Sequence, residues 1–144
     1  MRALLDVNVL IALLDPDHTF HDRAHAWWEA NRDAGWASCP LTENGIARIM
    51  SHPNYSRQLR LTPEDLVSRI ARFVAQTDHE FWPDDVSLRD DRVFDHARLH
   101  SSRLLTDIYL LALAVKHGGR LVTFDGDIPL VSVRSATADH LVTL

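Results

Sequence analysis

The sequence predicts an α/β fold in which a short parallel sheet is covered on both faces by helices. Its strand candidates are short continuous apolar runs, which is typical of strands buried on both faces. They alternate along the chain with segments of helical spacing, the order that builds a parallel sheet. The chain has 144 residues, of which 46% are apolar and 24% charged, so it has the size and composition of one globular domain. We therefore expect a single domain over residues 1–144.

The first strand and helix are defined by short-range signals. Ala3–Leu5 is an apolar run that ends at Asp6, and it predicts a buried strand. Residues 9–14 are apolar as well and predict a short buried helix. Asp15-Pro16 ends this helix, because the residue before a proline disfavours helical backbone.

A second helix is predicted from Thr19 to the region before Gly35. Thr19, with Asp22 three residues later, has the spacing of a capping box. The apolar residues that follow have helical spacing: Phe20, Ala24, Trp27 and Trp28. We expect Phe20 and at least one tryptophan in the core. Two adjacent tryptophans on a helix point in different directions, so one of them should be partly exposed.

The middle of the chain predicts two strands with two helices between them. Strand candidates cover residues 36–39 and 79–82. A helix is expected from about Thr42 to the region before Pro53. Residues 62–65, Thr-Pro-Glu-Asp, predict another helix start, since they combine a cap, a proline in the first turn and acids near the positive end of the dipole.

The last third of the chain predicts two helices and two strands. The apolar residues within 93–97 indicate a short helix. Thr106 is the expected cap of a longer helix that ends at Gly118-Gly119. Strand candidates follow at residues 120–124 and 140–143.

Four acidic residues occupy equivalent places in this plan. Asp6 and Asp125 follow predicted strands, whereas Glu43 and Asp107 lie in the first turns of predicted helices. The carboxyl ends of parallel strands and the starts of the helices after them lie along one edge of a sheet, where ligands bind. We therefore expect the four carboxylates to converge. Such a cluster either holds raised pKa values or binds a cation.

The donor atoms and the overall charge restrict the chemistry of this site. The only cysteine is Cys39, which excludes an internal disulfide framework and a cysteine-rich zinc site. Oxygen donors suit Mg²⁺ or Mn²⁺. These ions activate water and stabilise phosphoryl oxygens, so hydrolysis of a phosphate ester is the expected reaction. A net charge of −5 means that bulk positive charge does not hold a nucleic acid.

The ordered set of acidic motifs resembles the PIN-domain nucleases, and most closely their VapC-like toxins. The matching segments are residues 4–10 (LLDVNVL), 42–43 (TE), 106–107 (TD) and 121–125 (LVTFD). They span nearly the whole chain. The resemblance implies a three-layer α/β domain with a short parallel central sheet flanked by helices. It also implies an endoribonuclease that depends on Mg²⁺ or Mn²⁺.

Residue by residue, the resemblance assigns both the catalytic and the metal-binding role to the four acids: Asp6, Glu43, Asp107 and Asp125. It assigns supporting roles to nearby polar residues: Asn8, Thr106 and Thr123. Asp127 is an alternative to Asp125 for the last position, and we favour Asp125.

The resemblance also implies partners. These are an RNA substrate, a cognate VapB-like antitoxin and a second copy of the chain in a homodimer. Phe20, Trp27 and Trp28 are candidates for the antitoxin surface, and several arginines, Arg103 among them, for phosphate contacts. The sequence has no apolar run of about 20 residues that would span a membrane and no signal-peptide cleavage pattern. We therefore expect a cytoplasmic protein.

Two other functions remain open at this stage. Haloacid-dehalogenase-like phosphatases also begin with an apolar strand followed by Asp. They require a second Asp two residues later, where this chain has Asn8, and a lysine before the last acidic motif, where Lys116 is a poor match. The second alternative is a non-catalytic binding domain with a relict acidic pocket.

Overall fold

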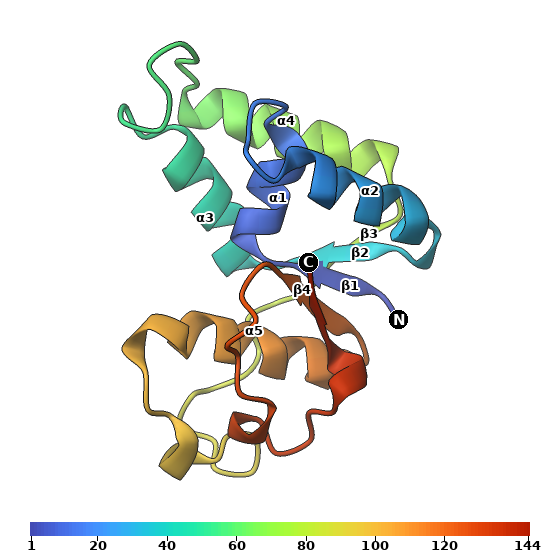
Figure 1. Cartoon of the computed structure of the whole chain (residues 1–144), viewed down its shortest axis with the longest axis vertical. Coiled ribbons are helices and arrows are strands. Elements are labelled where there is room, and N and C mark those ends of the chain that lie inside the picture. The colour runs from blue at the N-terminus through green and yellow to red at the C-terminus, as the bar shows by residue number, and fades with distance from the viewer.

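The fold is built around a five-stranded parallel sheet in the strand order β3-β2-β1-β4-β5 (Figure 1). The structure is a computed structural model that describes all residues, Met1–Leu144. The strands are β1 (Ala3–Leu5), β2 (Trp36–Ser38), β3 (His79–Phe81), β4 (Arg120–Thr123) and β5 (Leu141–Thr143). Every neighbouring pair is parallel, which confirms the sheet type that the sequence predicts.

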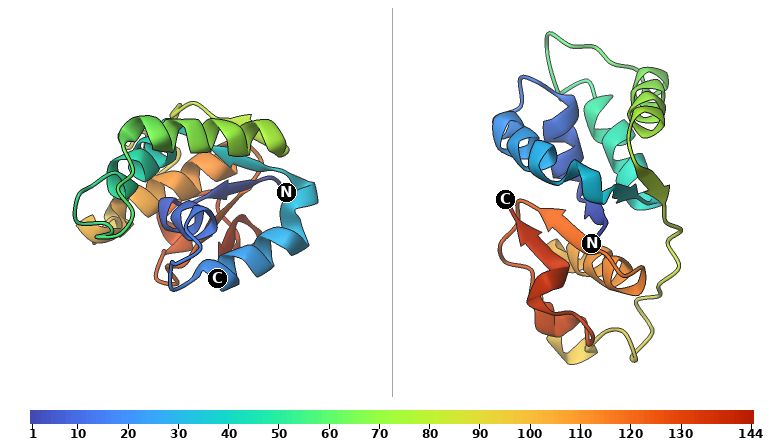
Figure 2. Two further views of the ribbon diagram at one scale, coloured as in Figure 1. Left: turned by 90° about the horizontal axis from the view of Figure 1, so that it is seen from above. Right: turned by 90° about the vertical axis from the view of Figure 1, so that its right-hand side faces the viewer.

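Helices cover both faces of this sheet and complete three layers. They are α1 (Val7–Leu14), α2 (His21–Asn31), α3 (Pro40–Met50), α4 (Pro63–Gln76) and α5 (Leu105–Lys116). Helices α1 to α4 lie on one side of the sheet, and α5 lies on the other with the long segments before and after it (Figures 1 and 2). None of the helices is long and apolar enough to cross a bilayer.

The strands divide the apolar core in two. Successive residues of a strand point to opposite faces of the sheet. Leu5 and Val122 accordingly pack with α1 to α4, whereas Leu4 and Leu121 pack with α5. All four side chains are fully buried. Burial on both faces explains why these strands are continuously apolar in the sequence.

The chain order places a topological switch point between β1 and β4. From β1 the chain moves to β2 and then to β3, and α5 brings it back to the other side of β1, where β4 pairs. Ligands of open α/β sheets bind in the crevice at the carboxyl ends of strands at such a point. Here those ends carry Asp6 and Thr123.

Most helix starts agree with the sequence signals within two residues. The Thr62 hydroxyl accepts a hydrogen bond from the Asp65 amide at 3.1 Å, and the Asp65 carboxylate accepts one from the Thr62 amide at 2.8 Å. This confirms the predicted cap of α4, which the reciprocal bond extends to a capping box. Helices α1 and α3 each begin two residues earlier than expected, at Val7 and Pro40.

Three local predictions are wrong. Thr19 does not cap α2, which begins at His21 after Phe20. Thr106 is not a cap either, because a short 3₁₀ turn (Ser102–Leu104) leads directly into α5 and places Thr106 inside its first turn. Val93 and Phe94 are not helical, and the only helical turn there is a 3₁₀ turn at His96–Arg98. Phe94 is fully buried and forms a bridge with Val133, so tertiary packing overrides the local pattern.

The aromatic residues of α2 divide as expected, with one exception. Trp28 is buried and Trp27 is half-buried, which confirms that two adjacent tryptophans do not share one environment. Phe20, however, is 39% exposed rather than in the core. It precedes the helix, so it does not belong to the helical stripe, and its ring lies against Phe124 with the centroids 5.0 Å apart.

Gly119 allows β1 and β4 to pair, so Gly119→Ala should destabilise the fold. A Cβ atom at this position would lie 2.5 Å from the Arg2 carbonyl oxygen and 2.6 Å from the Trp82 ring. The Arg2 oxygen accepts the Arg120 amide at 3.0 Å, so it cannot move without breaking the sheet. We expect a loss of about 1–3 kcal/mol of unfolding free energy in urea.

Gly126→Ala is the matched control for this measurement. A Cβ atom there would meet only Thr143 at 3.7 Å, an ordinary contact. Its unfolding free energy should stay within about 0.5 kcal/mol of the wild type. Equal stabilities of the two variants would contradict the role given to Gly119.

Candidate active site

Three carboxylates meet at the switch point of the sheet. Asp6 directly follows β1, Asp125 follows β4 after one residue, and Asp107 lies in the first turn of α5. Asp125 raises the pKa of Asp6, and both Asp6 and Asp125 raise the pKa of Asp107. The three predicted site residues therefore lie within one electrostatic neighbourhood.

Asp6 is the most rigidly held member of the cluster. It is only 6% exposed, and it is the N-cap residue of α1. One carboxylate oxygen accepts the Val7 amide at 2.7 Å, and the other accepts the Thr123 hydroxyl at 2.9 Å. Burial raises the pKa of Asp6, and these two hydrogen bonds oppose the rise because they favour the charged form.

Asp107 is a half-buried acid with a strongly raised pKa. Burial, followed by the charges of Asp6 and Asp125, raises its pKa to about 6, while Arg103 acts in the opposite direction. The carboxylate lies at the positive end of the α5 dipole, which favours the charged form. The neighbouring negative charges and burial outweigh that effect.

Arg103 joins the two candidate acids of the β4 loop. Its guanidinium donates to Asp125 at 2.9 Å and lies 3.4 Å from Asp127. Asp125 also accepts the Asp127 amide at 2.8 Å, and its side chain is 25% exposed against 77% for Asp127. Only Asp125 is coupled to Asp6 and Asp107, which favours Asp125 over Asp127 as the fourth acid.

Glu43 lies at the same sheet edge, one strand away, and has its own hydrogen-bond chain. It is in the first turn of α3, which follows β2. The Ser38 hydroxyl donates to the Glu43 carboxylate at 2.6 Å, and His79 Nε2 lies 2.8 Å from the same hydroxyl. The single hydroxyl proton is used on Glu43, so His79 Nε2 must donate to Ser38. These two hydrogen bonds therefore fix the orientation of the Glu43 carboxylate and the tautomer of His79.

The predicted supporting residues differ in their placement. Thr123 is fully buried, donates to Asp6 and accepts the Asp125 amide at 3.1 Å, so it links two of the acids. Asn8 and Thr106 are both exposed, in the first turns of α1 and α5. Neither side chain forms a hydrogen bond to an acid, so the support expected from them is not present in this structure.

The residues at this edge fit a hard divalent cation. Their donor atoms are carboxylate and hydroxyl oxygens. Burial, and after it the neighbouring negative charges, raises the pKa values of Asp6 and Asp107. Arg103 supplies a compensating charge to Asp125. No three His, Cys, Asp or Glu side chains are arranged around one point as metal ligands in this structure.

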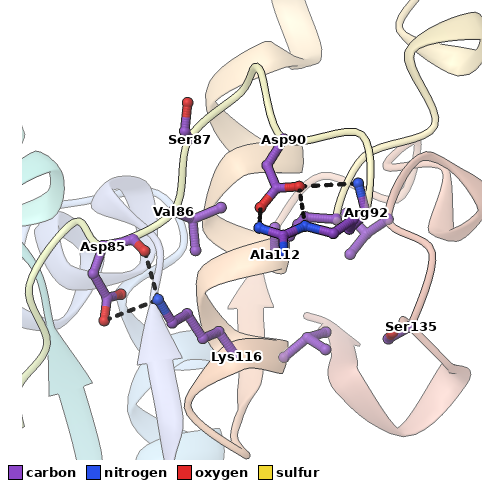
Figure 3. Close-up of a pocket in the computed structure, with 11 residues that line it drawn as sticks. Asp85, Val86, Ser87, Asp90, Arg92, Ala112, Lys116 and Ser135 are labelled. Atoms are coloured by element: carbon purple, nitrogen blue, oxygen red, sulfur yellow. Dashed lines mark hydrogen bonds and ion pairs between the residues drawn. The ribbon is translucent and has the colours of Figure 1, made fainter.

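A separate hollow of about 460 Å³ lies along the other end of α5 (Figure 3). Its charged groups are paired with one another: Lys116 with Asp85 at 3.3 Å, and Arg92 with Asp90 at 3.0 Å. Lys116 is the last residue of α5 and Asp107 is in its first turn, so they are about 13 Å apart along the helix axis. This hollow is not part of the acidic site.

Sequence reasoning missed two residues that bind an acid directly and a third that binds one of these two. Arg103 was a candidate for phosphate contact and not for pairing with Asp125, although its position one helical turn before Asp107 places it at the same edge. Ser38 ends a strand next to β1, which is the position that also identified the acids. His79 has no such signal, because its contact with Ser38 depends on the pairing of β3 with β2.

Comparisons with known proteins agree with this fold. The PIN domain family profile matches residues 3–133. The chain is 51% identical over 144 residues to Ribonuclease VapC44 of Mycobacterium tuberculosis, covering all of both chains. It is 44% identical over 125 residues to Ribonuclease VapC39 of the same organism, covering 87% of this chain and 89% of the relative.

Two solved structures share the fold at low sequence identity. One is the M. tuberculosis toxin VapC20, described as cleaving the sarcin-ricin loop, with a TM-score of 0.59, 16% identity and coverage of 88% of this chain and 92% of that one. The other is VapBC2 of Rickettsia felis, bound to a DNA fragment from its promoter. Its TM-score is 0.52 at 15% identity, with coverage of 88% and 90%.

Asp107→Asn should stabilise the metal-free protein at neutral pH. The folded pKa of about 6 lies above the ordinary value of 3.8, so the fold binds the proton more tightly than the unfolded chain does. That stabilisation is present below pH 4 and is lost as the pH rises through 6. Asn avoids the loss, and because Asp107 is only half-buried we expect a gain of about 1–2 kcal/mol at pH 7.5.

Urea unfolding in EDTA at pH 7.5 and pH 4 measures this effect. The gain of Asp107→Asn over the wild type should largely disappear at pH 4. A gain of equal size at both pH values would show that it does not come from the carboxylate charge.

Proposed function

Because this chain belongs to the PIN-domain family, we propose that it is an endoribonuclease, the toxin of a VapBC-type toxin–antitoxin pair. The observation that carries this conclusion is identity of 51% over the full length of a VapC ribonuclease. The proximity of Asp6, Asp107 and Asp125 at the switch point, where neighbouring acids add to the effect of burial in raising the pKa values of Asp6 and Asp107, supports this proposal.

We propose Mg²⁺ or Mn²⁺ as the cofactor and the four acids as the residues that hold it: Asp6, Glu43, Asp107 and Asp125. When bound, such an ion supplies an activated water and stabilises negative charge on the phosphate. The oxygen-only donor set and the raised pKa values of Asp6 and Asp107 support this assignment. Asp127, exposed and outside the coupled cluster, is the weaker alternative to Asp125.

Neighbouring residues of the chain orient three of the four acids. Thr123 and the Val7 amide hold the Asp6 carboxylate in one orientation, so its oxygens need little rearrangement. Ser38 and His79 do the same for Glu43. Arg103 holds Asp125 through a mostly exposed guanidinium, which is free to move to an RNA phosphate when Asp125 turns inward.

The partners follow from the family. A VapBC pair is among the solved structures that share this fold, and we propose that a VapB-like antitoxin restrains this chain. RNA is the substrate class of a ribonuclease. We also propose that two copies of this chain form a homodimer.

The phosphatase alternative lacks its lysine. Lys116 lies at the far end of α5 from Asp107 and pairs with Asp85. It is therefore not available to a phosphate group bound at the acids.

Substitution of single acids should separate the roles within the site. Asp6→Asn and Asp125→Asn should each slow metal-dependent cleavage of total RNA by more than about 100-fold, beyond the 10–100-fold typical of an outer-shell residue. Asp127→Asn should cleave close to the wild-type rate. Fragments on sequencing gels, with Mn²⁺ or EDTA, measure all three. If Asp127→Asn were inactive and Asp125→Asn active, the assignment of the fourth acid would be reversed.

Arg103→Ala should strengthen Mn²⁺ binding. The guanidinium competes with a cation for Asp125, so its removal should raise the affinity about two- to fivefold, the value of an exposed ion pair. Calorimetric titration of the antitoxin-free protein measures it. Arg98→Ala is the control, since Arg98 lies only at the limit of pairing with Asp95, at 4.0 Å. Weaker Mn²⁺ binding in Arg103→Ala would show that Arg103 organises the site rather than competing for it.

A further inference from the structure

A partly exposed aromatic cluster lies next to the acidic site in the sequence, at the carboxyl end of β4. The Phe20 ring packs against Phe124, with the ring centroids 5.0 Å apart, and against His18 at 5.9 Å. The guanidinium of Arg23 lies over the Phe20 ring, 4.9 Å from its centroid. The four residues come from the segment between α1 and α2, the start of α2 and the end of β4. We refer to them as the aromatic platform.

Covalent geometry fixes how near the platform lies to the acids. Phe124 stands between Thr123, which donates to Asp6, and Asp125. Consecutive Cα atoms are about 3.8 Å apart, so the Phe124 ring begins one residue from two members of the acidic site. Phe20 packs on Phe124, so the aromatic surface lies on the other side of residues 123–125 from the acidic cluster.

Phe20 is the exposed ring of the platform. The residue is 39% exposed, whereas His18 and Phe124 are half-buried, and Phe124 packs against the apolar core on the α1 to α4 side of the sheet. Phe20 occupies the N-cap position of α2 without any side-chain cap. The loop is nevertheless ordered by local hydrogen bonds, since the Phe20 amide donates to His18 Nδ1 at 3.0 Å. The ring is thus held at the surface.

We propose that this platform stacks an unpaired nucleobase of the RNA substrate, next to the nucleotide that is cleaved. The inference rests on the proposed ribonuclease function. Single-stranded RNA is recognised by stacking of its bases on aromatic rings and on arginine planes, which are the two groups that Phe20 and Arg23 present. A base can replace the flexible Arg23 guanidinium over the ring or stack beyond it.

Charge favours stacking over phosphate attraction as the source of binding here. The chain has a net charge of −5, and the acidic site itself repels phosphate when no metal is bound. Asp17 and Asp22 are exposed in the same segment and offset Arg23. Contact with the faces of bases gives an attraction that these charges do not cancel.

The antitoxin is the other macromolecule that could bury an exposed phenylalanine. RNA is favoured because the platform is joined to the acidic site through residues 123–125 and presents aromatic rings and a cation.

Binding of a short fluorescent oligoadenylate tests the proposal without cleavage. All measurements use the Asp6→Asn variant as a background, so that the oligoadenylate is not cleaved. This background is compared with three double variants that also carry Phe20→Ala, Phe20→Leu or Phe20→Trp. We expect Ala and Leu to weaken binding by roughly 5- to 150-fold, the loss of one stacked base, whereas Trp should retain it. The same oligoadenylate annealed to oligouridylate should bind weakly and show no dependence on Phe20.

Val131→Ala is the control. Val131 is 61% exposed in the 3₁₀ turn Leu130–Ser132, so it is another surface apolar side chain, outside both the platform and the acidic site. It should leave oligoadenylate binding unchanged. Thermal melting of each variant shows that the fold is intact, and the Leu variant keeps the apolar bulk if the Ala variant is unstable.

The salt dependence of binding gives an independent readout. Loss of stacking should lower the affinity of Phe20→Leu without changing the slope of log affinity against log salt, because no phosphate contact is removed. A reduced slope would overturn the stacking interpretation.

Three further outcomes are decisive. If Phe20→Leu binds oligoadenylate like the wild-type residue, the proposal is wrong. If it binds RNA normally but loses affinity for the cognate antitoxin, the platform is an antitoxin surface and the proposal is also wrong. If binding depends on Phe20 while the wild-type chain cleaves no RNA with Mn²⁺, the platform stands and the ribonuclease assignment fails.

Discussion

The hydrogen bond from Thr123 to Asp6 is the contact on which the arrangement of the site depends. It joins the carboxyl ends of β1 and β4 across 117 positions of sequence. Asp6 is buried, and a buried carboxylate without donors would not remain charged at neutral pH. The same Thr123 hydroxyl accepts the Asp125 amide, so one side chain positions the first and the last acid of the site. The parallel pairing of β1 with β4 makes this contact possible, which is why the packing of Gly119 against Arg2 affects the site as well as the sheet.

The acidic cluster opposes the stability of the fold that carries it. Burial and mutual repulsion raise the pKa of Asp6 and Asp107, so at neutral pH the folded state holds charges that the unfolded chain would carry at lower free energy. Arg103 relieves part of the repulsion at Asp125. It does so from the surface, where an ion pair is weak. Arg103 is therefore a weak counter-ion, which the proposed divalent cation would be able to displace from Asp125.

The sequence predicted the sheet well because burial on both faces leaves an unambiguous apolar pattern in β1, β2 and β4. It also identified three coupled acids, because their positions follow from topology: each lies after a strand or at the start of a helix on the same edge. The errors fall where tertiary contacts override local pattern. Phe94 looks helical but pairs with Val133, and Thr106 looks like a cap but continues a preceding 3₁₀ turn.

The partners of the acids were less predictable than the acids themselves. The contact of Ser38 with Glu43 follows local spacing, since the two are five residues apart, but the contact of His79 with Ser38 requires that β3 be the neighbour of β2. The pairing of Phe20 with Phe124 requires the loop before α2 to reach the end of β4. These contacts join distant segments through the strand order, which a single sequence does not encode by periodicity.

Residues 123–125 link the aromatic platform and the acids. Their side chains alternate, so that Thr123 faces the acidic cluster and Phe124 faces the Phe20 ring. A protein with a net negative charge can thus engage RNA at a negative site, because base stacking acts on one side of this segment and the phosphate chemistry on the other.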